Sequence, residues 1–137
     1  MTFEYSSNIA KECSITCPPV EAVPTDLEVW RTVNSLPPKA TDFLSDIETN
    51  KKCRDKANCL HWGCSIWPSE EAAIHARDLF GWVRAKFVVK VRLVPTDGQI
   101  LSTPTRDQPE HSTFWKDTRV DLSTKSSVAF SPEKREQ

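Results

Sequence analysis

The chain has 137 residues, of which 38% are hydrophobic and 27% are charged, and its formal net charge is −1. This length fits one folded domain, and the near-neutral charge argues against binding to nucleic acid or anionic lipid through bulk electrostatics. No stretch approaches about 18 consecutive apolar residues, and the N-terminus lacks the basic start and apolar run of a signal peptide. We therefore expect a cytoplasmic protein with no membrane partner and with nucleic acid as a disfavoured partner.

The two ends of the chain differ in character from its middle. Residues 1–24 contain three prolines and show no sustained period of 2 or 3.6 residues, which predicts a disordered arm. Residues 119–137 are rich in serine, threonine and lysine and predict a polar tail that is too hydrophilic to order itself. Between them, residues 25–118 predict a single α+β domain.

The first half of this domain carries three predicted elements. Residues 27–33 alternate between apolar and polar positions, which is typical of a half-buried strand. A short helix is predicted to follow over residues 41–47, capped by Thr41. Residues 60–67 predict a second strand, which Pro68 ends.

The second half adds one helix and three strands. Ser69 is the predicted N-cap of a helix over residues 70–80, whose alanines form one apolar stripe. Residues 85–94 show the clearest alternation of the chain, and residues 99–103 are predicted to return as their hairpin partner. A last short strand is predicted over residues 111–115. This order predicts an α+β fold: a small, mainly antiparallel or mixed sheet with two helices packed on it and disordered tails.

Five cysteines invite a metal site or disulfides, but their spacing favours neither. Zinc ligands usually come in pairs two to four residues apart on a tight knuckle, and the chain contains no Cys-x-x-Cys. An odd number of cysteines without a secretion signal also argues against disulfides. Cys64 shares its predicted strand face with Trp62 and Ile66, which is typical of a buried free thiol.

Arg31 is unusual because it lies in mid-strand on the face that also carries Leu27, Val29 and Val33. A guanidinium keeps its charge in proteins, so among aliphatic neighbours it needs a negative partner. An ordinary internal ion pair or a rim position with the head in water would satisfy it. A bound phosphate or carboxylate would do the same, which makes Arg31 a candidate ligand-binding residue.

Residues 111–115 place an imidazole, a hydroxyl and a large aromatic surface on one strand face. Alternation puts His111, Thr113 and Trp115 side by side, which suits a polar, ring-bearing ligand. Trp115 would stack on the ring, Thr113 would form hydrogen bonds, and His111 would supply acid–base catalysis or contact a phosphate. The alternative is a structural strand with its tryptophan in the core and its histidine bonded internally.

Four runs of residues stand in a recognisable order. They are Val29-Trp-Arg-Thr-Val33, Pro37-Pro38-x-x-x-Asp42-Phe43-x-Ser45, Gly63-x-Ser65-x-x-x-Ser69-x-Glu71-x-Ala73 and His111-x-Thr113-x-Trp115. Together they resemble a set of small uncharacterised bacterial proteins over residues 25–118. The layout also resembles the ADP-ribosyltransferase-like fold, which implies that Arg31 contacts a dinucleotide and Ser65 supports its pocket. The paired late glutamate of that class has no counterpart here, since Glu110 is the only glutamate near the late strand.

Two functions follow as predictions from these residues. The first is binding of a small anionic, phosphorylated or nucleotide-like ligand, with ADP-ribosyltransferase-like chemistry as its enzymatic form and His111 as the catalytic residue. Its predicted pocket consists of Arg31, Ser65, His111, Thr113 and Trp115. The second is a non-enzymatic accessory or inhibitor module that docks a protein partner through a surface containing Trp30 and Trp67. The sequence identifies no cofactor, and no metal site is expected.

Overall fold

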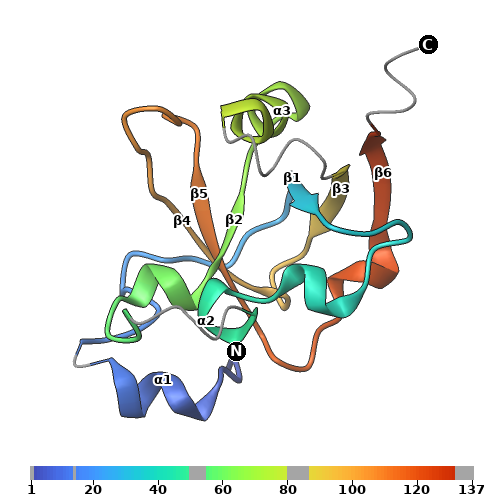
Figure 1. Cartoon of the computed structure of the whole chain (residues 1–137). Helices are drawn as coiled ribbons and strands as arrows, with labels where there is room; N and C mark the ends of the chain where they lie inside the picture. The colour runs from blue at the N-terminus through green and yellow to red at the C-terminus, as the bar shows by residue number, and fades with distance from the viewer. Residues whose placement is uncertain (1, 14, 50–54, 80–86, 132–137) are drawn as a thin grey trace.

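The computed structural model describes residues 2–13, 15–49, 55–79 and 87–131, and its elements are shown in Figure 1. The helices are α1 (Ser7–Glu12), α2 (Asp46–Thr49) and α3 (Glu70–Leu79), with single 3₁₀ turns at Ala40–Phe43, Cys59–Trp62 and Leu122–Lys125. The strands are β1 (Leu27–Val33), β2 (Cys64–Ile66), β3 (Phe87–Leu93), β4 (Gly98–Ser102), β5 (Ser112–Lys116) and β6 (Ser126–Phe130). The predicted α+β class is confirmed. No helix in the described ranges has the length and hydropathy that crossing a bilayer requires.

The strands form two antiparallel sheets of three strands each, where the sequence predicted one sheet. The first has the order β1-β3-β6 and the second the order β2-β5-β4. Trp30 of β1 and Trp67, which follows β2, join them by exchanging two backbone hydrogen bonds of 2.9 Å. β1 and β2 therefore lie where the two sheets meet (Figure 1). β1 carries Arg31 and β2 carries Ser65.

The predicted hairpin between residues 85–94 and 99–103 is wrong, although both strands exist. β3 pairs with β1 along one edge and with β6 along the other, so neither edge is open to β4. The chain turns after β3 through Asp97, whose carboxylate accepts the backbone N–H of Val94 at 2.9 Å. β4 then pairs with β5 in the other sheet. Local alternation identifies strands, but long-range competition for edges decides their partners.

Helix α3 covers the sheet formed by β1, β3 and β6 (Figure 1). Ser69 caps it as predicted, because its Oγ accepts the backbone N–H of Ala72 at 3.1 Å. The buried side of the helix is made of small residues, so its backbone lies close to Val88 and Phe130 of the sheet. The predicted helix end at Phe80 and strand start at Ala85 lie outside the described residues. The opposite face of the same sheet carries the main apolar core, in which Val29 and Val91 pack against Phe114 of the second sheet.

Two predicted elements have different shapes. The helix predicted over residues 41–47 is a 3₁₀ turn, Ala40–Phe43, followed by the four-residue α2, and Thr41 lies inside the turn rather than capping it. Likewise, the first part of the strand predicted over residues 60–67 is the 3₁₀ turn Cys59–Trp62. Both segments are short because side chains hold their backbone locally: the Asn58 side chain, for example, accepts the N–H of Leu60 at 3.0 Å.

The prediction of a disordered arm over residues 1–24 is corrected by the structure. Residues Ser7–Glu12 form α1, whose Ile9 is buried with Trp62 and Trp115. Further along, Val23 forms a β-bridge with Ile100 of β4. The sequence of the arm shows no hydrophobic periodicity because single residues such as Ile9 and Val23 contact the domain, rather than one continuous apolar face.

The polar tail predicted over residues 119–137 is corrected as well. Its segment Ser126–Phe130 is β6, which pairs with β3, and Leu122 and Phe130 are buried. Phe130 packs against α3, and the guanidinium of Arg77 lies 4.9 Å from its ring centre. A strand this short and polar gains its order from the edge it joins rather than from its own composition.

A disulfide joins Cys17 of the arm to Cys59, contrary to the sequence-based expectation that disulfides are absent. Counting cysteines did not reveal it, because the pair is 42 residues apart and meets only in the folded chain. Cys64 is a free, buried thiol, as predicted. Beside the disulfide, Cys13 is also free and only partly buried.

Removing this disulfide should destabilise the fold. We expect the double substitution Cys17→Ala and Cys59→Ala to lower the free energy of unfolding by about 2–4 kcal/mol, because closing a loop of this length restricts the unfolded chain. Urea unfolding followed by tryptophan fluorescence measures the change. Cys13→Ala, which removes a neighbouring thiol without opening the bridge, is the matched control and should change the stability by less than about 1 kcal/mol. Equal stability of the double variant and the native chain would contradict the bridge.

Candidate functional site

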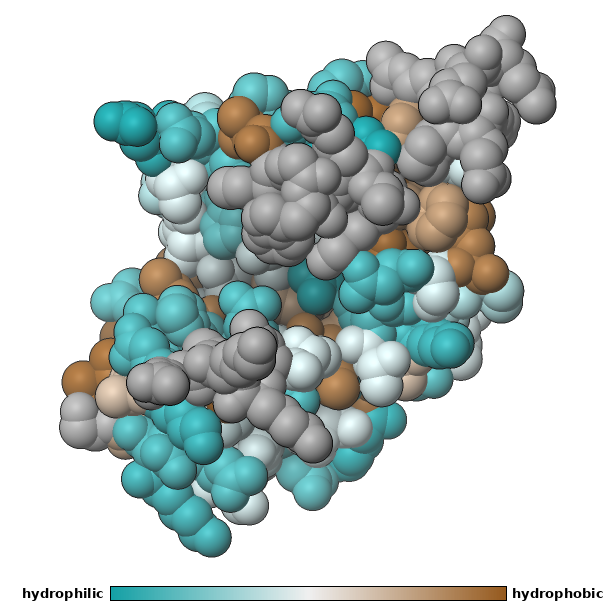
Figure 2. Space-filling model, in the orientation of Figure 1, coloured by the Kyte–Doolittle hydropathy of each residue, from teal (hydrophilic) through white to brown (hydrophobic). Residues whose placement is uncertain are grey.

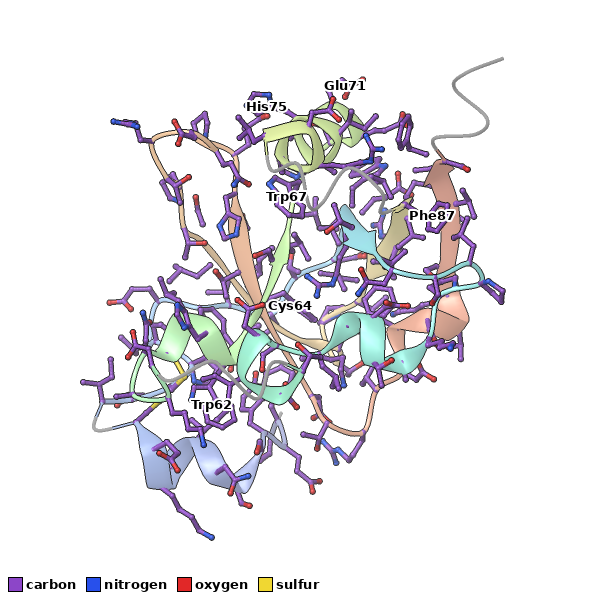
Figure 3. The ribbon with its side chains drawn as sticks, in the orientation of Figure 1. Trp62, Cys64, Trp67, Glu71, His75 and Phe87 are labelled. Carbon is purple, nitrogen blue, oxygen red and sulfur yellow. A yellow bond between two sulfur atoms is a disulfide. The ribbon has the colours of Figure 1, made fainter. Side chains whose placement is uncertain are left out.

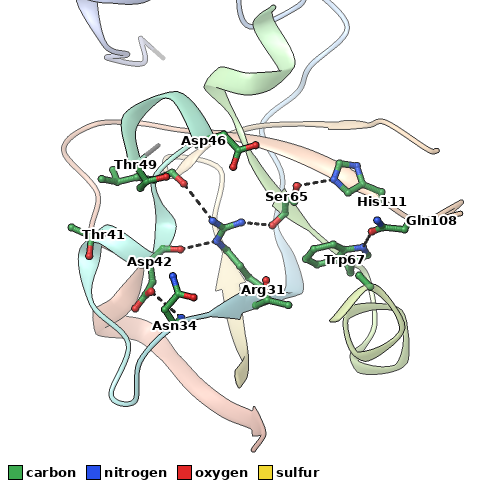
Figure 4. Close-up of a pocket in the computed structure, with 13 residues that line it drawn as sticks. Arg31, Asn34, Thr41, Asp42, Asp46, Thr49, Ser65, Trp67, Gln108 and His111 are labelled. Carbon is green, nitrogen blue, oxygen red and sulfur yellow. Dashed lines mark hydrogen bonds between the residues drawn. The ribbon is translucent and has the colours of Figure 1, made fainter. Parts of the chain in front are cut away.

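A pocket of about 270 Å³ opens where the two sheets meet. Figure 2, in the orientation of Figure 1, shows this face of the molecule hollowed between the level of α3 and that of α2. The side chains of the pocket come from β1, β2, α2, α3, the 3₁₀ turn Ala40–Phe43, the segments beside these elements and the loop that precedes β5 (Figure 4). They are Arg31, Thr32, Asn34, Thr41, Asp42, Leu44, Asp46, Thr49, Ser65, Trp67, Ala76, Gln108 and His111. Three of the five residues predicted for the site, Arg31, Ser65 and His111, therefore line one cavity.

Arg31 is held on the pocket wall by backbone carbonyls. Its Nε donates to the carbonyl of Asp42 at 2.9 Å, its Nη1 to that of Ser65 at 2.6 Å, and its Nη2 to that of Leu44 at 3.3 Å. A guanidinium has five N–H donors, so these bonds leave two. Within the described ranges no carboxylate lies within ion-pair distance of Arg31. The neighbours thus fix the direction of the guanidinium without pairing its charge (Figure 4).

The two acidic residues of the pocket differ in how they are held. Asp42 is buried, and its carboxylate accepts the N–H of Asn34 at 3.0 Å, the hydroxyl of Ser35 at 2.9 Å and the N–H of Lys39 at 2.9 Å. Burial raises the pKa of Asp42, but these hydrogen bonds and the nearby charge of Arg31 outweigh burial and lower the pKa below its usual value. The Asp42 carboxylate is therefore ionised and structurally occupied. Asp46, by contrast, is exposed at the rim.

Ser65 and His111 form a hydrogen-bonded pair in the same wall. His111 Nε2 lies 2.8 Å from Ser65 Oγ, and its Nδ1 lies 3.0 Å from the carbonyl oxygen of Thr103. A carbonyl only accepts hydrogen bonds, so Nδ1 carries the proton and Nε2 accepts from the hydroxyl of Ser65. Burial lowers the pKa of His111 below its usual value, and the hydrogen bond to Thr103 opposes this shift only in part. Burial thus favours the neutral imidazole near pH 7.

Trp115 and Thr113 do not reach the pocket, which corrects their predicted contact with a ligand. Trp115 is 1% exposed, and its Nε1 donates to the carbonyl of Cys59 at 3.1 Å. Thr113 is 3% exposed, and its hydroxyl lies 2.8 Å from that of Thr103. His111, Thr113 and Trp115 share one strand face as predicted, but Trp115 packs into the buried cluster that contains Cys59 of the disulfide.

The aromatic residue of the pocket is Trp67. Its Nε1 donates to Gln108 Oε1 at 3.0 Å, and its ring meets that of His111 edge to face with centroids 5.7 Å apart. Trp67 was predicted to lie on a surface that docks a partner together with Trp30. The structure corrects this prediction for Trp67, whose side chain is only 6% exposed. Trp67 lies beneath α3 (Figure 3). The sequence predicted Trp67 as the last residue of a strand and as part of a docking surface, and did not predict its place in the pocket.

A shallower hollow adjoins this pocket on the other side of Trp67. It is lined by Glu71 and His75 of α3 and by Gln108, Pro109 and Glu110 of the loop before β5. His75 is exposed, and its Nε2 lies 3.3 Å from the carbonyl of Asp107. Figure 3 shows Glu71 and His75 on the outer side of α3. Among the residues that the structure describes, no group of histidine, cysteine, aspartate and glutamate side chains is arranged to hold a metal ion.

Loop and turn residues make up the part of the site that sequence analysis missed. Asp46 and Gln108 lie in short or irregular segments, where only the folded chain shows that they face Arg31 and His111. Asp42 and Asp46 were predicted only as acidic residues near the start of a short helix, and Asp42 also as part of a resemblance. Comparison with known proteins adds no assignment: no family model, curated protein or solved structure matches this chain.

Proposed function

We propose that this pocket binds a phosphorylated, nucleotide-like ligand, with a single phosphate at Arg31. The observation that carries the proposal is a permanent positive charge on the cavity wall that no described carboxylate pairs. Two of its N–H donors are left for a ligand, and Arg–phosphate hydrogen bonds are short and strong because both groups are charged. The carbonyls of Asp42, Leu44 and Ser65 hold the guanidinium in place before binding, which reduces the entropy lost on complex formation.

The charges and the size of the pocket narrow the ligand class. Asp42 and Asp46 place two negative charges beside the single positive charge of Arg31, which disfavours a ligand with several phosphates. Carboxylates accept hydrogen bonds from ribose hydroxyls, and Asp46 has no hydrogen-bond or ion-pair partner for its carboxylate among the described residues. The volume of about 270 Å³ lies just below the range of roughly 300–1,000 Å³ that is usual for small-molecule sites. A mononucleotide, or one half of a dinucleotide, meets these conditions.

An ADP-ribosyltransferase-like activity is the enzymatic form of this proposal. In that form Arg31 contacts the dinucleotide, Ser65 supports the pocket, and His111 supplies acid–base catalysis. Support comes from the placement of all three side chains in one cavity. Glu110, the only glutamate near the late strand, lines the adjoining hollow together with Gln108 and Trp67 rather than the pocket itself.

Docking of a protein partner has less support from the arrangement of the tryptophans. Trp67 is buried, and Trp30 is half-buried and uses its backbone to join the two sheets. Hot spots of interfaces are enriched in tryptophan, tyrosine and arginine side chains that a partner can reach. A small ligand in the pocket is therefore favoured over a partner on this face.

The cytoplasm is the compartment that we propose for this protein. Disulfides persist mainly in oxidising compartments, so in the cytoplasm Cys17 and Cys59 would be held as thiols. The pocket does not depend on that bridge for any of its lining residues, which lie on other segments. Ligand binding is accordingly expected with the bridge reduced as well as oxidised.

Calorimetric titration with AMP and adenosine tests the proposal. AMP should bind at least tenfold more tightly than adenosine, because only AMP carries a phosphate to Arg31, and tenfold corresponds to about 1.4 kcal/mol. Inorganic phosphate alone should bind more weakly than AMP, since it lacks the ribose that Asp46 recognises. Equal affinity for AMP and adenosine, or no binding of any of these ligands, would refute the proposed function.

A further inference from the structure

The pair formed by Ser65 and His111 has the geometry of an activated nucleophile. Ser65 Oγ lies 2.8 Å from His111 Nε2, within the range expected between a nucleophile and its general base. The second ring nitrogen is fixed by Thr103, whose carbonyl oxygen lies 3.0 Å and whose hydroxyl lies 2.9 Å from Nδ1. Nucleophile, base and orienting group thus lie next to one another in space, although Ser65 lies on β2, His111 directly precedes β5 and Thr103 directly follows β4.

We infer that Ser65 is a nucleophile activated by His111, and that the protein hydrolyses small carboxylic esters whose acyl group fits this pocket. The inference rests on the contact between these two side chains, whereas nucleotide binding rests on the charge of Arg31. Both side chains are partly exposed and line the cavity, so a substrate reaches them. A histidine that is neutral near pH 7 is ready to accept the proton of the hydroxyl.

Arg31 supplies the positive charge that such a reaction needs. Its Nη1 lies 2.6 Å from the carbonyl oxygen of Ser65, so the guanidinium adjoins the residue that carries the nucleophile. A tetrahedral intermediate places a full negative charge on the former carbonyl oxygen of the ester. A fixed cation in the same cavity stabilises this charge without having to reorganise. The carbonyls that hold Arg31 provide the fixed orientation.

The proposed reaction balances with water as its second substrate. Ser65 Oγ forms a bond to the carbonyl carbon while its proton passes to His111 Nε2, and the electron pair of the C=O bond moves to oxygen. When that pair returns, the C–O bond to the alcohol breaks, and the alcohol leaves with the proton from His111. Water, deprotonated by His111, then attacks the acyl-serine. The acid is released, and Ser65 regains its proton.

A fluorophosphonate probe tests the inference directly. Attack by Ser65 forms an O–P bond and expels fluoride, and the labelled residue is identified in the intact full-length chain by peptide mass spectrometry. We expect Ser65 to be the main labelled residue and Ser65→Ala to lose that label. His111→Gln retains a hydrogen-bonding side chain but cannot take the proton, so it should label at least 100-fold more slowly. His75→Ala, which removes an exposed histidine outside the pair, is the matched control and should label at the native rate.

Two results would overturn the inference. One is labelling of native Ser65 no faster than that of the other serines of the chain. The other is a native labelling rate in His111→Gln, which would show that the hydrogen bond is only structural. Circular dichroism and thermal unfolding of each variant separate lost reactivity from lost folding, and Ser65→Ala is small enough to leave both sheets intact. Hydrolysis of p-nitrophenyl acetate, measured with the same variants, should follow the same order. Failure of these assays leaves AMP binding at Arg31 unaffected, so the two proposals stand or fall separately.

Discussion

Replacing Arg31 by methionine should weaken AMP binding by at least 100-fold and lower the free energy of unfolding by about 1–3 kcal/mol. Methionine keeps an unbranched apolar chain between Val29 and Val33, so the strand face remains filled. The loss in binding follows from removing a charged donor of bidentate geometry from the phosphate position. The loss in stability follows because the carbonyls of Asp42, Leu44 and Ser65 all lose their donor at once.

The controls for Arg31 come from the same pair of strands. Arg92 on β3 forms an exposed ion pair with Asp26 at 2.8 Å, and exposed pairs contribute little to stability. Arg92→Met should therefore leave AMP affinity unchanged and alter the stability by less than about 1 kcal/mol. Arg31→Lys retains the charge but lacks the planar arrangement of donors, and should restore only part of the affinity. Calorimetry and urea unfolding measure both quantities, and native AMP affinity in Arg31→Met would contradict the assigned phosphate position.

Alternation along the chain was sufficient to predict Arg31 as a site residue. A charged residue is unexpected on a strand face that otherwise carries apolar residues at every second position. The strand itself, β1, has the predicted bounds. Ser65 was predicted for the site only through a resemblance, and His111 through its position at a short polar strand. That these residues share a cavity could not be derived from either pattern. It depends on how the two sheets join at Trp30 and Trp67.

The parts that sequence analysis missed are those in which distant segments determine the structure. β6 is a strand because β3 offers it an edge and because Phe130 packs under α3, and neither fact is encoded within residues 119–137 alone. The arm is ordered by Ile9 and by the link from Cys17 to Cys59, two contacts without a period. Local patterns report burial on one face, whereas the order of strands in a sheet is a property of the whole chain.

Replacing Trp115 by alanine should destabilise the protein by about 3–5 kcal/mol, the largest effect that we expect from a single substitution outside the pocket. The indole is 1% exposed and packs with Trp62 and Ile9, so its removal leaves a cavity that the surrounding helix and turn cannot fill. It also deprives the Cys59 carbonyl of the donor that lies 3.1 Å away. Urea unfolding followed by circular dichroism measures the loss, since removing a tryptophan alters the fluorescence itself.

Trp115→Phe separates the structural role of this residue from its predicted contact with a ligand. Phenylalanine retains most of the buried area, so this variant should remain folded, with a smaller loss of about 1–3 kcal/mol. If Trp115 is a core residue, AMP affinity in the Phe variant equals that of the native chain, whereas Trp67→Phe weakens it because the ring that borders His111 and Gln108 changes. A loss of affinity in Trp115→Phe with native affinity in Trp67→Phe would show that the ligand stacks on the late strand instead. Such a result would move the binding site away from the cavity beside Arg31.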